Sequence, residues 1–368
     1  MKRFLKAATR RPVAFGSLIV LALLYLMMAL AEPLSPYRPG TTFRNHGYHP
    51  PNLVFYSEEL GFGPQVQRRV LMDEVKVQYA RIRGEYYRVK LFARGPGYRL
   101  WGLIPSTIHL FGVEAPYEAE GPGWTEGGQG YPVFLLGADH LGRDLFSRIL
   151  HGARISLTIG FIGISISLTL AILLGGLAGY YGGWVDWTIM RMAELFILIP
   201  GLYMILFLRS VLSREMDPGQ SFIIITIILS LVGWPGSARL VRGMVHSIKR
   251  EDFITAAELA GIPSVVIIFR QIIPQMASIL IVSITLGIPG FILGETVLSY
   301  LGLGIIDPAV SWGSLLNREI TQLANLRRFP WLLLPGLFLL LTTLSFNFLG
   351  DLLRDLMDPY FRERRLGQ

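Results

Sequence analysis

The sequence predicts an all-α polytopic membrane protein with six transmembrane helices and a small extracytoplasmic insert of mixed structure. Hydrophobic residues make up 52% of the 368, and they are gathered into blocks of about 20 rather than into amphipathic stripes. Charged residues make up only 16%, against roughly 25% in soluble domains. The mean hydropathy is +0.47. Charge is concentrated between the apolar blocks, which is typical of a chain that crosses a bilayer repeatedly.

Six apolar blocks are long enough to cross about 30 Å of hydrocarbon at about 1.5 Å per residue. They are residues 13–31, 155–178, 192–208, 222–241, 276–298 and 331–350. A further apolar stretch, 262–273, is shorter and contains Arg270. We therefore expect it to form a helix at the membrane surface rather than a seventh crossing.

Basic residues predict the orientation of the chain. Five of them lie in residues 1–12, so this end is expected in the cytoplasm. Counting crossings places the loop 246–275 and the tail 351–368 there as well, and both are rich in Arg or Lys. Residues 32–154 are then expected outside. A signal peptide ending at Ala31 is the alternative for the first block, which is longer than the usual apolar region of about 7 to 15 residues.

The insert, residues 32–136, differs in composition from the rest of the chain, with clusters of Pro, Gly, Tyr and Arg. Residues 75–93 alternate in part between apolar and polar, which predicts a hairpin that turns near Arg83-Gly84-Glu85. Five glycines within 121–130 predict a flexible loop. The fold and role of this insert are left open by the sequence.

Most catalytic chemistry is excluded by what the sequence lacks. Without cysteine there is no thiol nucleophile, disulfide or cysteine-ligated metal. None of the five lysines follows a glycine, so there is no P-loop, and no His-Glu-x-x-His pair supports a zinc site. We expect the six histidines at the surface. The net charge of +8 is distributed as membrane orientation requires, so neither nucleic-acid binding nor a catalytic or metal site is predicted.

Glu295 is the candidate for the translocation path, because an ionisable group inside an apolar span is costly unless it faces a polar cavity or a partner. A structural Glu hydrogen-bonded between helices is the equally weighted alternative. Pro200, Pro235 and Pro289 lie within spans, each near a glycine, and predict kinks.

Small residues recur at four-residue spacing at Ala171, Gly175 and Gly179, which predicts the close approach of a neighbouring helix. Arg191 and Glu194 are three residues apart and are expected to pair on a helix surface. Arg239 and Arg242 are expected to act as anchors at the membrane edge.

The loop 246–275 carries the most specific motif. It reads Phe253-Ile-Thr-Ala-Ala-Glu-Leu-Ala-Gly261, followed by Pro274 in Ile272-Ile273-Pro274. This resembles the Glu-Ala-Ala loop of the inner-membrane permeases of binding-protein-dependent ABC importers. The resemblance implies that this loop docks an ATPase subunit. The residues concerned are Glu251, Thr255, Ala256, Ala257, Glu258, Gly261 and Pro274.

Other motifs resemble the dipeptide, oligopeptide and nickel branch of these permeases, over about residues 137 to 360. They include Leu141-Gly-Arg-Asp144, Gly152-Ala-Arg-Ile-Ser156, Gly179-Tyr-Tyr-Gly-Gly-Trp-Val-Asp186, Gly233-Trp-Pro-Gly236, Leu298-Ser-Tyr-Leu-Gly-Leu-Gly304 and Asn347-Phe-Leu-Gly-Asp351. Two features depart from the family. Thr255 replaces the Glu that begins the loop, and the insert is much longer than is typical.

The resemblance implies a type I ABC-importer core in residues 155–350 of a bacterial inner-membrane protein. The implied partners are a second homologous permease, two ATPase subunits that hold ATP and Mg²⁺, and an extracytoplasmic solute-binding protein. The chain itself is then not an enzyme and needs no cofactor. Peptide is the favoured substrate, with nickel or another solute open. A proton-coupled transporter using Glu295 is the alternative function, and a receptor anchored by helices is a third class.

Overall fold

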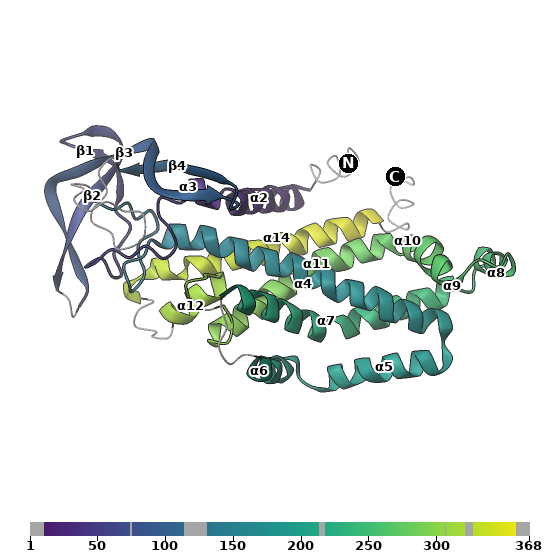
Figure 1. Cartoon of the computed structure of the whole chain (residues 1–368). Helices are drawn as coiled ribbons and strands as arrows, with labels where there is room; N and C mark the ends of the chain where they lie inside the picture. The colour runs from purple at the N-terminus through teal and green to yellow at the C-terminus, as the bar shows by residue number, and fades with distance from the viewer. Residues whose placement is uncertain are drawn as a thin grey trace. The chain divides into compact units, whose positions relative to one another are not determined.

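The computed structural model describes residues 11–73, 76–113, 131–212, 218–305, 307–320 and 327–357. The chain divides into two compact units. One comprises Met1–Ala22, Leu157–Val297 and Leu340–Gln368, and the other comprises Leu23–Ser156 and Leu298–Leu339. The first is helical, and the second contains a four-stranded sheet together with short helices. Figure 1 identifies the elements by label.

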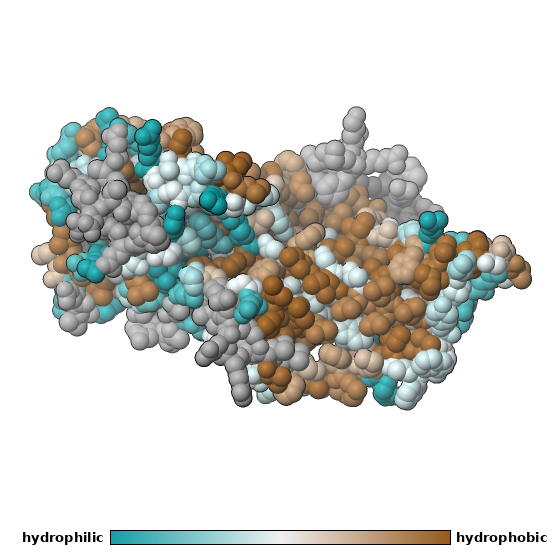
Figure 2. Space-filling view, viewed as in Figure 1, coloured by the Kyte–Doolittle hydropathy of each residue, from teal (hydrophilic) through white to brown (hydrophobic). Residues whose placement is uncertain are grey.

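Five of the six predicted spans coincide with helices that are long and apolar enough to cross a membrane. They are α2 (Pro12–Ala29), α4 (Leu145–Tyr181), α7 (Pro218–Ile248), α11 (Ala277–Tyr300) and α14 (Leu334–Met357), the last preceded by the 3₁₀ helix η2 (Pro330–Leu333). Hydrophobic residues cover much of the helical surface in Figure 2, as a lipid-facing surface requires.

The third predicted span, 192–208, is not one straight helix. It divides into α5 (Gly183–Leu198) and α6 (Gly201–Leu212), and the two axes are bent by 91°. Pro200 explains the break, because it lacks an amide N–H and disfavours the helical conformation of the preceding residue. Ile199 is accordingly extended, at φ −82° and ψ 121°. By contrast, Pro235 and Pro289 lie inside α7 and α11, which continue past them.

The apolar stretch 262–273 forms part of a short helix that packs into the protein. It comprises α9 (Ser264–Val266), a π-helical turn η1 (Ile267–Ile272) and α10 (Ile273–Gln275). Ile267, Ile268 and Ile272 are buried among other helices, whereas Val265 and Phe269 are exposed, so only one side of this apolar helix packs into the protein. The π turn ends two residues before Pro274, whose missing N–H disturbs the ordinary helical hydrogen bonding.

The predicted close approach at the small residues of α4 is confirmed. A methyl group at Gly175 would overlap the carbonyl oxygen of Ala238 on α7, and one at Gly179 would lie 2.7 Å from the carbonyl oxygen of Arg242. The backbones of α4 and α7 therefore touch directly, as small residues allow in membrane helices. Arg242 also pairs with Asp186 of α5, so it is an interhelical partner and not only a membrane-edge anchor.

The insert contains an antiparallel meander in the order β1-β2-β3-β4. The strands are β1 (Leu53–Ser57), β2 (Gly61–Asp73), β3 (Gln78–Leu100) and β4 (Ile104–Val113). The short helix α3 (Ala31–Leu34) precedes them, and α12 (Trp312–Ile320) belongs to the same unit. The glycine-rich stretch 121–130 lies outside the described residues.

The predicted hairpin turn near Arg83-Gly84-Glu85 is wrong. The chain turns between Asp73 and Gln78, and Gly84 lies within β3 at φ +83°. The register changes there, because Gln67 pairs with Tyr86 whereas Arg69 pairs with Arg81. The glycine thus permits a bulge in a 23-residue strand rather than a reversal.

The expectation of surface histidines is wrong for His46, His49 and His109, which are all buried. The Nδ1 atom of His49 lies 2.7 Å from the Pro50 carbonyl oxygen and Nε2 lies 2.9 Å from the Tyr131 hydroxyl. His109 is held between the carbonyl oxygens of Ser35 and Pro96. Histidine is intermediate between buried and exposed residue types, so the burial of these three side chains could not be predicted from the sequence.

Candidate coupling helix and buried acid

The motif of the loop 246–275 folds as the short helix α8 (Asp252–Leu259). Its end is a Schellman motif, in which the Gly261 N–H donates to the Glu258 carbonyl and the Ile262 N–H donates to the Ala257 carbonyl. Gly261 has φ +74°, a conformation that favours glycine. Since a methyl group there would meet nothing within 4 Å in this chain, backbone conformation rather than crowding explains this glycine.

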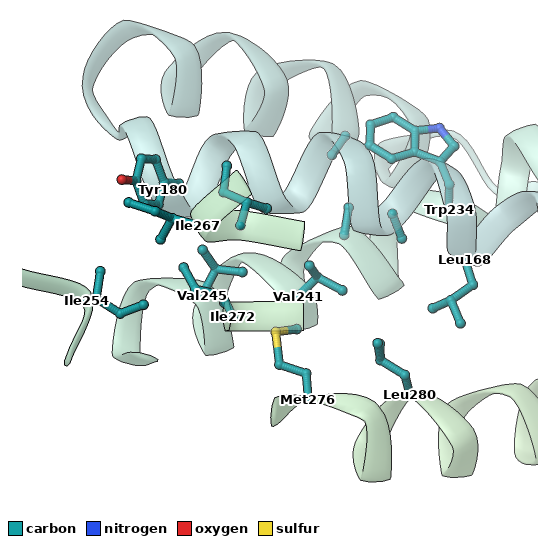
Figure 3. Packing of buried hydrophobic residues seen from close by; sticks show 14 of the residues in the cluster. Leu168, Tyr180, Trp234, Val241, Val245, Ile254, Ile267, Ile272, Met276 and Leu280 are labelled. Atoms are coloured by element: carbon teal, nitrogen blue, oxygen red, sulfur yellow. The ribbon is translucent and has the colours of Figure 1, made fainter. Parts of the chain in front are cut away.

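One face of α8 is anchored in the helical unit. Ile254 and Ala257 are buried in a cluster to which α4, α7 and α11 also contribute. Figure 3 shows Ile254 beside residues of this cluster such as Val245, Ile267 and Ile272. The small-residue set therefore divides, because Ala257 packs inward while Ala256 is exposed.

The opposite face of α8 is exposed and combines acidic, small and apolar groups. Glu251, Thr255, Ala256 and Glu258 all lie on this surface. Two apolar residues that the motif did not single out lie there as well, since Phe253 is exposed and Leu259 is 86% exposed. Leu259 lies well away from Ile254 and Ala257 around the helix, whereas Phe253 is four residues before Ala257 and lies at the edge of the buried face.

Glu258 is tied to the end of α4. Its Oε1 accepts a hydrogen bond of 2.8 Å from the Tyr180 hydroxyl. Lys249 donates to the Tyr180 carbonyl oxygen at 2.7 Å, and its Nζ lies 4.8 Å from the centre of the Tyr180 ring. The ends of α4, α7 and α8 are thus joined by both polar and apolar contacts. Glu251 begins α8 as its N-cap residue, without a side-chain cap hydrogen bond.

Pro274 is exposed in α10, at the end of the apolar helix that packs beneath α8. Met276 and Leu280 follow it and belong to the same cluster as Ile254. The stretch from α8 to α11 is therefore one packed connection and not a free loop.

Glu295 lies in α11 and is fully buried within the helical unit. It takes part in a hydrogen bond or an electrostatic interaction. The glycine before it, Gly294, lies against Leu229 of α7, where a methyl group would be 3.0 Å from a Leu229 methyl carbon. In the single chain Glu295 therefore belongs to a tightly packed helix contact.

A second group of interacting charged side chains lies in and near residues 137–156, for which no role was predicted. Arg143 donates to Asp139 at 2.7 Å and to Asp307 at 3.2 Å, and Arg148 also lies within ion-pair distance of both carboxylates. Burial raises the pKa of Asp144 to about 7, although hydrogen bonds from Ser147 lower it. The pairs with Asp307, whose side chain is partly exposed, join the loop before α4 to the segment that follows α11. Within the described residues, no group of three or more His, Asp and Glu side chains is placed to hold a metal ion.

Comparisons with known proteins place these features in context. A family profile described as the binding-protein-dependent transport system inner membrane component matches residues 171–363. A second, described as the N-terminal TM domain of oligopeptide transport permease C, matches residues 1–51. The first match covers most of the region over which the resemblance was predicted, and the second lies in a region for which none was predicted.

Individual relatives agree with these profiles. The chain is 40% identical to the oligopeptide transport system permease protein OppC of Haemophilus influenzae over 63% of this chain and 71% of that protein. It is 39% identical to the dipeptide transport system permease protein DppC of Bacillus subtilis, over 62% and 69%. A solved chain of the MetNI methionine ABC transporter, in an inward-facing conformation, overlaps with a TM-score of 0.40 at 16% identity, over 58% of this chain and 96% of that one.

Proposed function

The chain belongs to the family of binding-protein-dependent transport system inner membrane components, and we propose that it forms half of the translocation pathway of an ATP-driven peptide importer. The peptide substrate is inferred from the printed names of the relatives, which are oligopeptide and dipeptide permeases. The other half of the pathway would be a second homologous permease. An extracytoplasmic solute-binding protein would deliver the peptide to the pair.

The two faces of α8 carry this proposal. One face is packed into the cluster of α4, α7 and α11, and the other presents Phe253, Ala256 and Leu259 to solvent. A partner that binds the exposed face would move the helices that the buried face contacts. Two ATPase subunits, which would hold ATP and Mg²⁺, are the proposed partners. Their hydrolysis cycle would drive alternating access.

The orientation follows from the same proposal. If α8 meets cytoplasmic ATPases and α5 together with α6 makes one crossing, both ends of the chain are cytoplasmic and the four-stranded sheet is extracytoplasmic. Reporter fusions after Gln220 should then report outside, and fusions after Arg250 should report inside. An outside signal at Arg250 would contradict the docking of an ATPase on α8.

The docking face is tested by Leu259→Asp, with Leu259→Met as the matched control. Leu259 is 86% exposed, so neither substitution should disturb the fold. The charged variant should lose ATPase subunits from the purified complex, because it buries a carboxylate in the contact without a partner. The Met variant should retain them, since it is apolar and of similar volume. Equal retention by both variants would exclude this face.

The same assay can identify which acidic residue contacts the ATPase in place of the Glu that Thr255 replaces. We predict that Glu258→Ala or Glu251→Ala weakens ATPase docking more than Thr255→Ala. Because Glu258 also accepts a hydrogen bond from Tyr180, Tyr180→Phe is the needed control, since it removes that bond and keeps the acid. If Tyr180→Phe alone reproduces the loss, Glu258 acts by holding α8 and not by contacting the ATPase.

Glu295 is proposed as a residue of the translocation path formed with the second permease. Glu295→Gln preserves shape and should leave assembly intact while changing peptide uptake or its dependence on peptide charge. Unchanged uptake in the Gln variant, with misfolding in a Leu variant, would identify Glu295 as a packing group. Transport that needs a proton gradient but no ATP would overturn the importer proposal in favour of the proton-coupled alternative.

A further inference from the structure

The turn that joins β3 and β4 is an apolar hairpin tip. Leu100 of β3 pairs with Ile104 of β4, and Trp101, Gly102 and Leu103 form the turn between them. Trp101 has φ +53° and Gly102 has φ +76°. Such a left-handed backbone is uncommon for a bulky residue, so this turn holds its indole in a defined position at a conformational cost.

The side chains at this tip are directed to solvent. Trp101 is 63% exposed, Leu103 is 81% exposed and Ile104 is 61% exposed. Ile108 continues the exposed apolar surface along β4. Several large apolar side chains in sequence are unfavourable in water, and a contiguous exposed patch of this kind marks an interaction site.

The tip is fixed to the C-terminal end of the apolar helix α2. The Trp101 indole N–H donates to the Ala29 carbonyl oxygen at 2.7 Å, and Ala29 is the last residue of α2. Arg154 caps the same end by donating to the Met28 carbonyl oxygen at 3.2 Å, and it also pairs with Glu32 at 2.6 Å. The last carbonyl groups of a helix lack intrahelical partners, so these donors satisfy them where the apolar span ends.

The end of α2 indicates the depth of the hairpin tip relative to the membrane. A helix that crosses a bilayer ends near the headgroup region, and Arg154 and Glu32 at the end of α2 are groups suited to that boundary. Leu26 just before the cap and Leu30 just after it are exposed apolar residues and continue the lipid-facing surface of the span. The tip adjoins that surface at the level of the cap.

We propose that the β3–β4 tip inserts into the phospholipid bilayer beside the end of α2, with Leu103 and Ile104 among acyl chains and Trp101 at the interface. Trp is enriched at membrane interfaces, where an apolar ring and a polar N–H are both satisfied. Arg99, which is exposed next to the turn, is placed to meet lipid phosphate groups. This inference depends only on α2 spanning the membrane, and not on the substrate or on ATPase docking.

The chain has no cysteine, so single cysteines can carry a nitroxide label without background. The full-length chain, with the subunits that co-purify with it, would be placed in nanodiscs of phosphatidylethanolamine and phosphatidylglycerol. Collisional relaxation by oxygen, which concentrates in lipid, is compared with relaxation by a water-soluble nickel chelate. The test position is Leu103→Cys. The matched control is Phe62→Cys at the β1–β2 hairpin, where Phe62 is 85% exposed.

We expect the label at position 103 to be relaxed more by oxygen than by the nickel chelate, and the label at position 62 to show the reverse. Equal access of nickel to both positions would overturn the proposal by placing the tip in water. Protection of position 103 from both reagents would overturn it as well, by indicating that a solute-binding protein or a second permease covers the tip.

The role of the indole N–H is tested in the same system. Trp101→Phe keeps an aromatic ring and removes the donor to Ala29. We expect the oxygen-to-nickel ratio at position 103 to fall in this background, because the tip is no longer held at the end of α2. An unchanged ratio would show that Trp101 does not position the tip.

Discussion

The buried cluster around α8 and the core of the sheet-containing unit are built differently. The cluster is made of aliphatic side chains and close helix contacts, with Ile254, Ile267 and Ile272 fully or almost fully buried. In the other core, directed hydrogen bonds are prominent. Asn52 donates to the Pro132 carbonyl at 2.8 Å and accepts from the Phe134 N–H at 2.8 Å.

Each unit is therefore sensitive to a different kind of change. Apolar packing has no direction, so the helical cluster should respond to changes in side-chain volume. A buried polar core should respond to the loss of a single partner or to a change in charge, because an unsatisfied buried group keeps its full desolvation cost. Changes of volume in the helical unit and changes of charge or hydrogen-bond partner in the sheet-containing unit should therefore have separable effects.

The largest expected loss of stability comes from removing side-chain volume on the buried face of α8. Ile254→Ala removes buried carbon from the cluster and should lower the free energy of unfolding by about 2–5 kcal/mol. Leu259→Ala, on the exposed face of the same helix, should change it by less than about 0.5 kcal/mol. Thermal unfolding of the purified protein in detergent measures both. Equal effects would contradict the assignment of the buried face.

The next largest effect is on stability, which should change in opposite directions when two different glycines are replaced by alanine. Gly175→Ala places a methyl group against the backbone of α7 and should destabilise the protein by about 1–3 kcal/mol. Gly243→Ala lies on α7 itself, where nothing is within 4 Å, and should stabilise it by up to about 1 kcal/mol. Melting temperatures that shift in the same direction would refute a close contact between α4 and α7.

Much of the helical unit could be predicted from the sequence because its signals are local. Apolar block length located five spans, and four-residue spacing of small residues located the contact at Gly175. The bend at Pro200 was harder to predict, because proline breaks one helix here while Pro235 and Pro289 lie within continuous ones. The neighbouring helices decide which outcome a given proline has.

The sheet-containing unit was harder to predict because its signals are not local. Gly84 marks a turn or a bulge equally well from sequence alone, and the pairing of distant strands decides between them. The burial of His49 depends on Tyr131, which lies 82 residues away. In α8 the motif identified the helix, but which of its residues face inward depended on contacts with α7 and η1.

A third prediction tests the polar core through pH. Burial lowers the pKa of His49 well below 6.5, and burial also lowers the pKa of His46. At these two positions the unfolded chain therefore binds more protons than the folded one once the pH falls below about 6.5. These two histidines should each lower the stability of this unit by up to about 1.4 kcal/mol per pH unit as the pH falls below about 6.5. Asp144 of the same unit, whose pKa burial raises to about 7, has the opposite effect as the pH falls through 7, so the part due to His49 is read from the difference between the wild type and a His49 variant.

Hydrogen exchange of β1 and β2 between pH 7 and pH 5, corrected for intrinsic rates, measures this slope. His49→Gln removes one titrating group and should reduce the pH dependence, whereas helix α7 should show none of it. A slope that is equally steep in the Gln variant would assign the pH dependence to other groups.

The smallest effects should come from exposed ion pairs, and here the two units should behave alike. Arg68 and Glu85 pair at 2.6 Å across the β2–β3 bulge, with each side chain 39% exposed, while Arg191 and Glu194 pair at 2.6 Å along α5. Exposed pairs contribute about 0.2–1 kcal/mol, because water screens the attraction and ordering two long side chains costs entropy. Glu85→Gln and Glu194→Gln should therefore each lower the unfolding free energy by less than about 1 kcal/mol, and by less still in high salt. A double-mutant cycle on each pair gives the coupling energy directly. A coupling well above 1 kcal/mol at Arg68–Glu85 alone would show that this pair, and not Gly84, holds the bulge, and that charge matters more in the sheet than along α5.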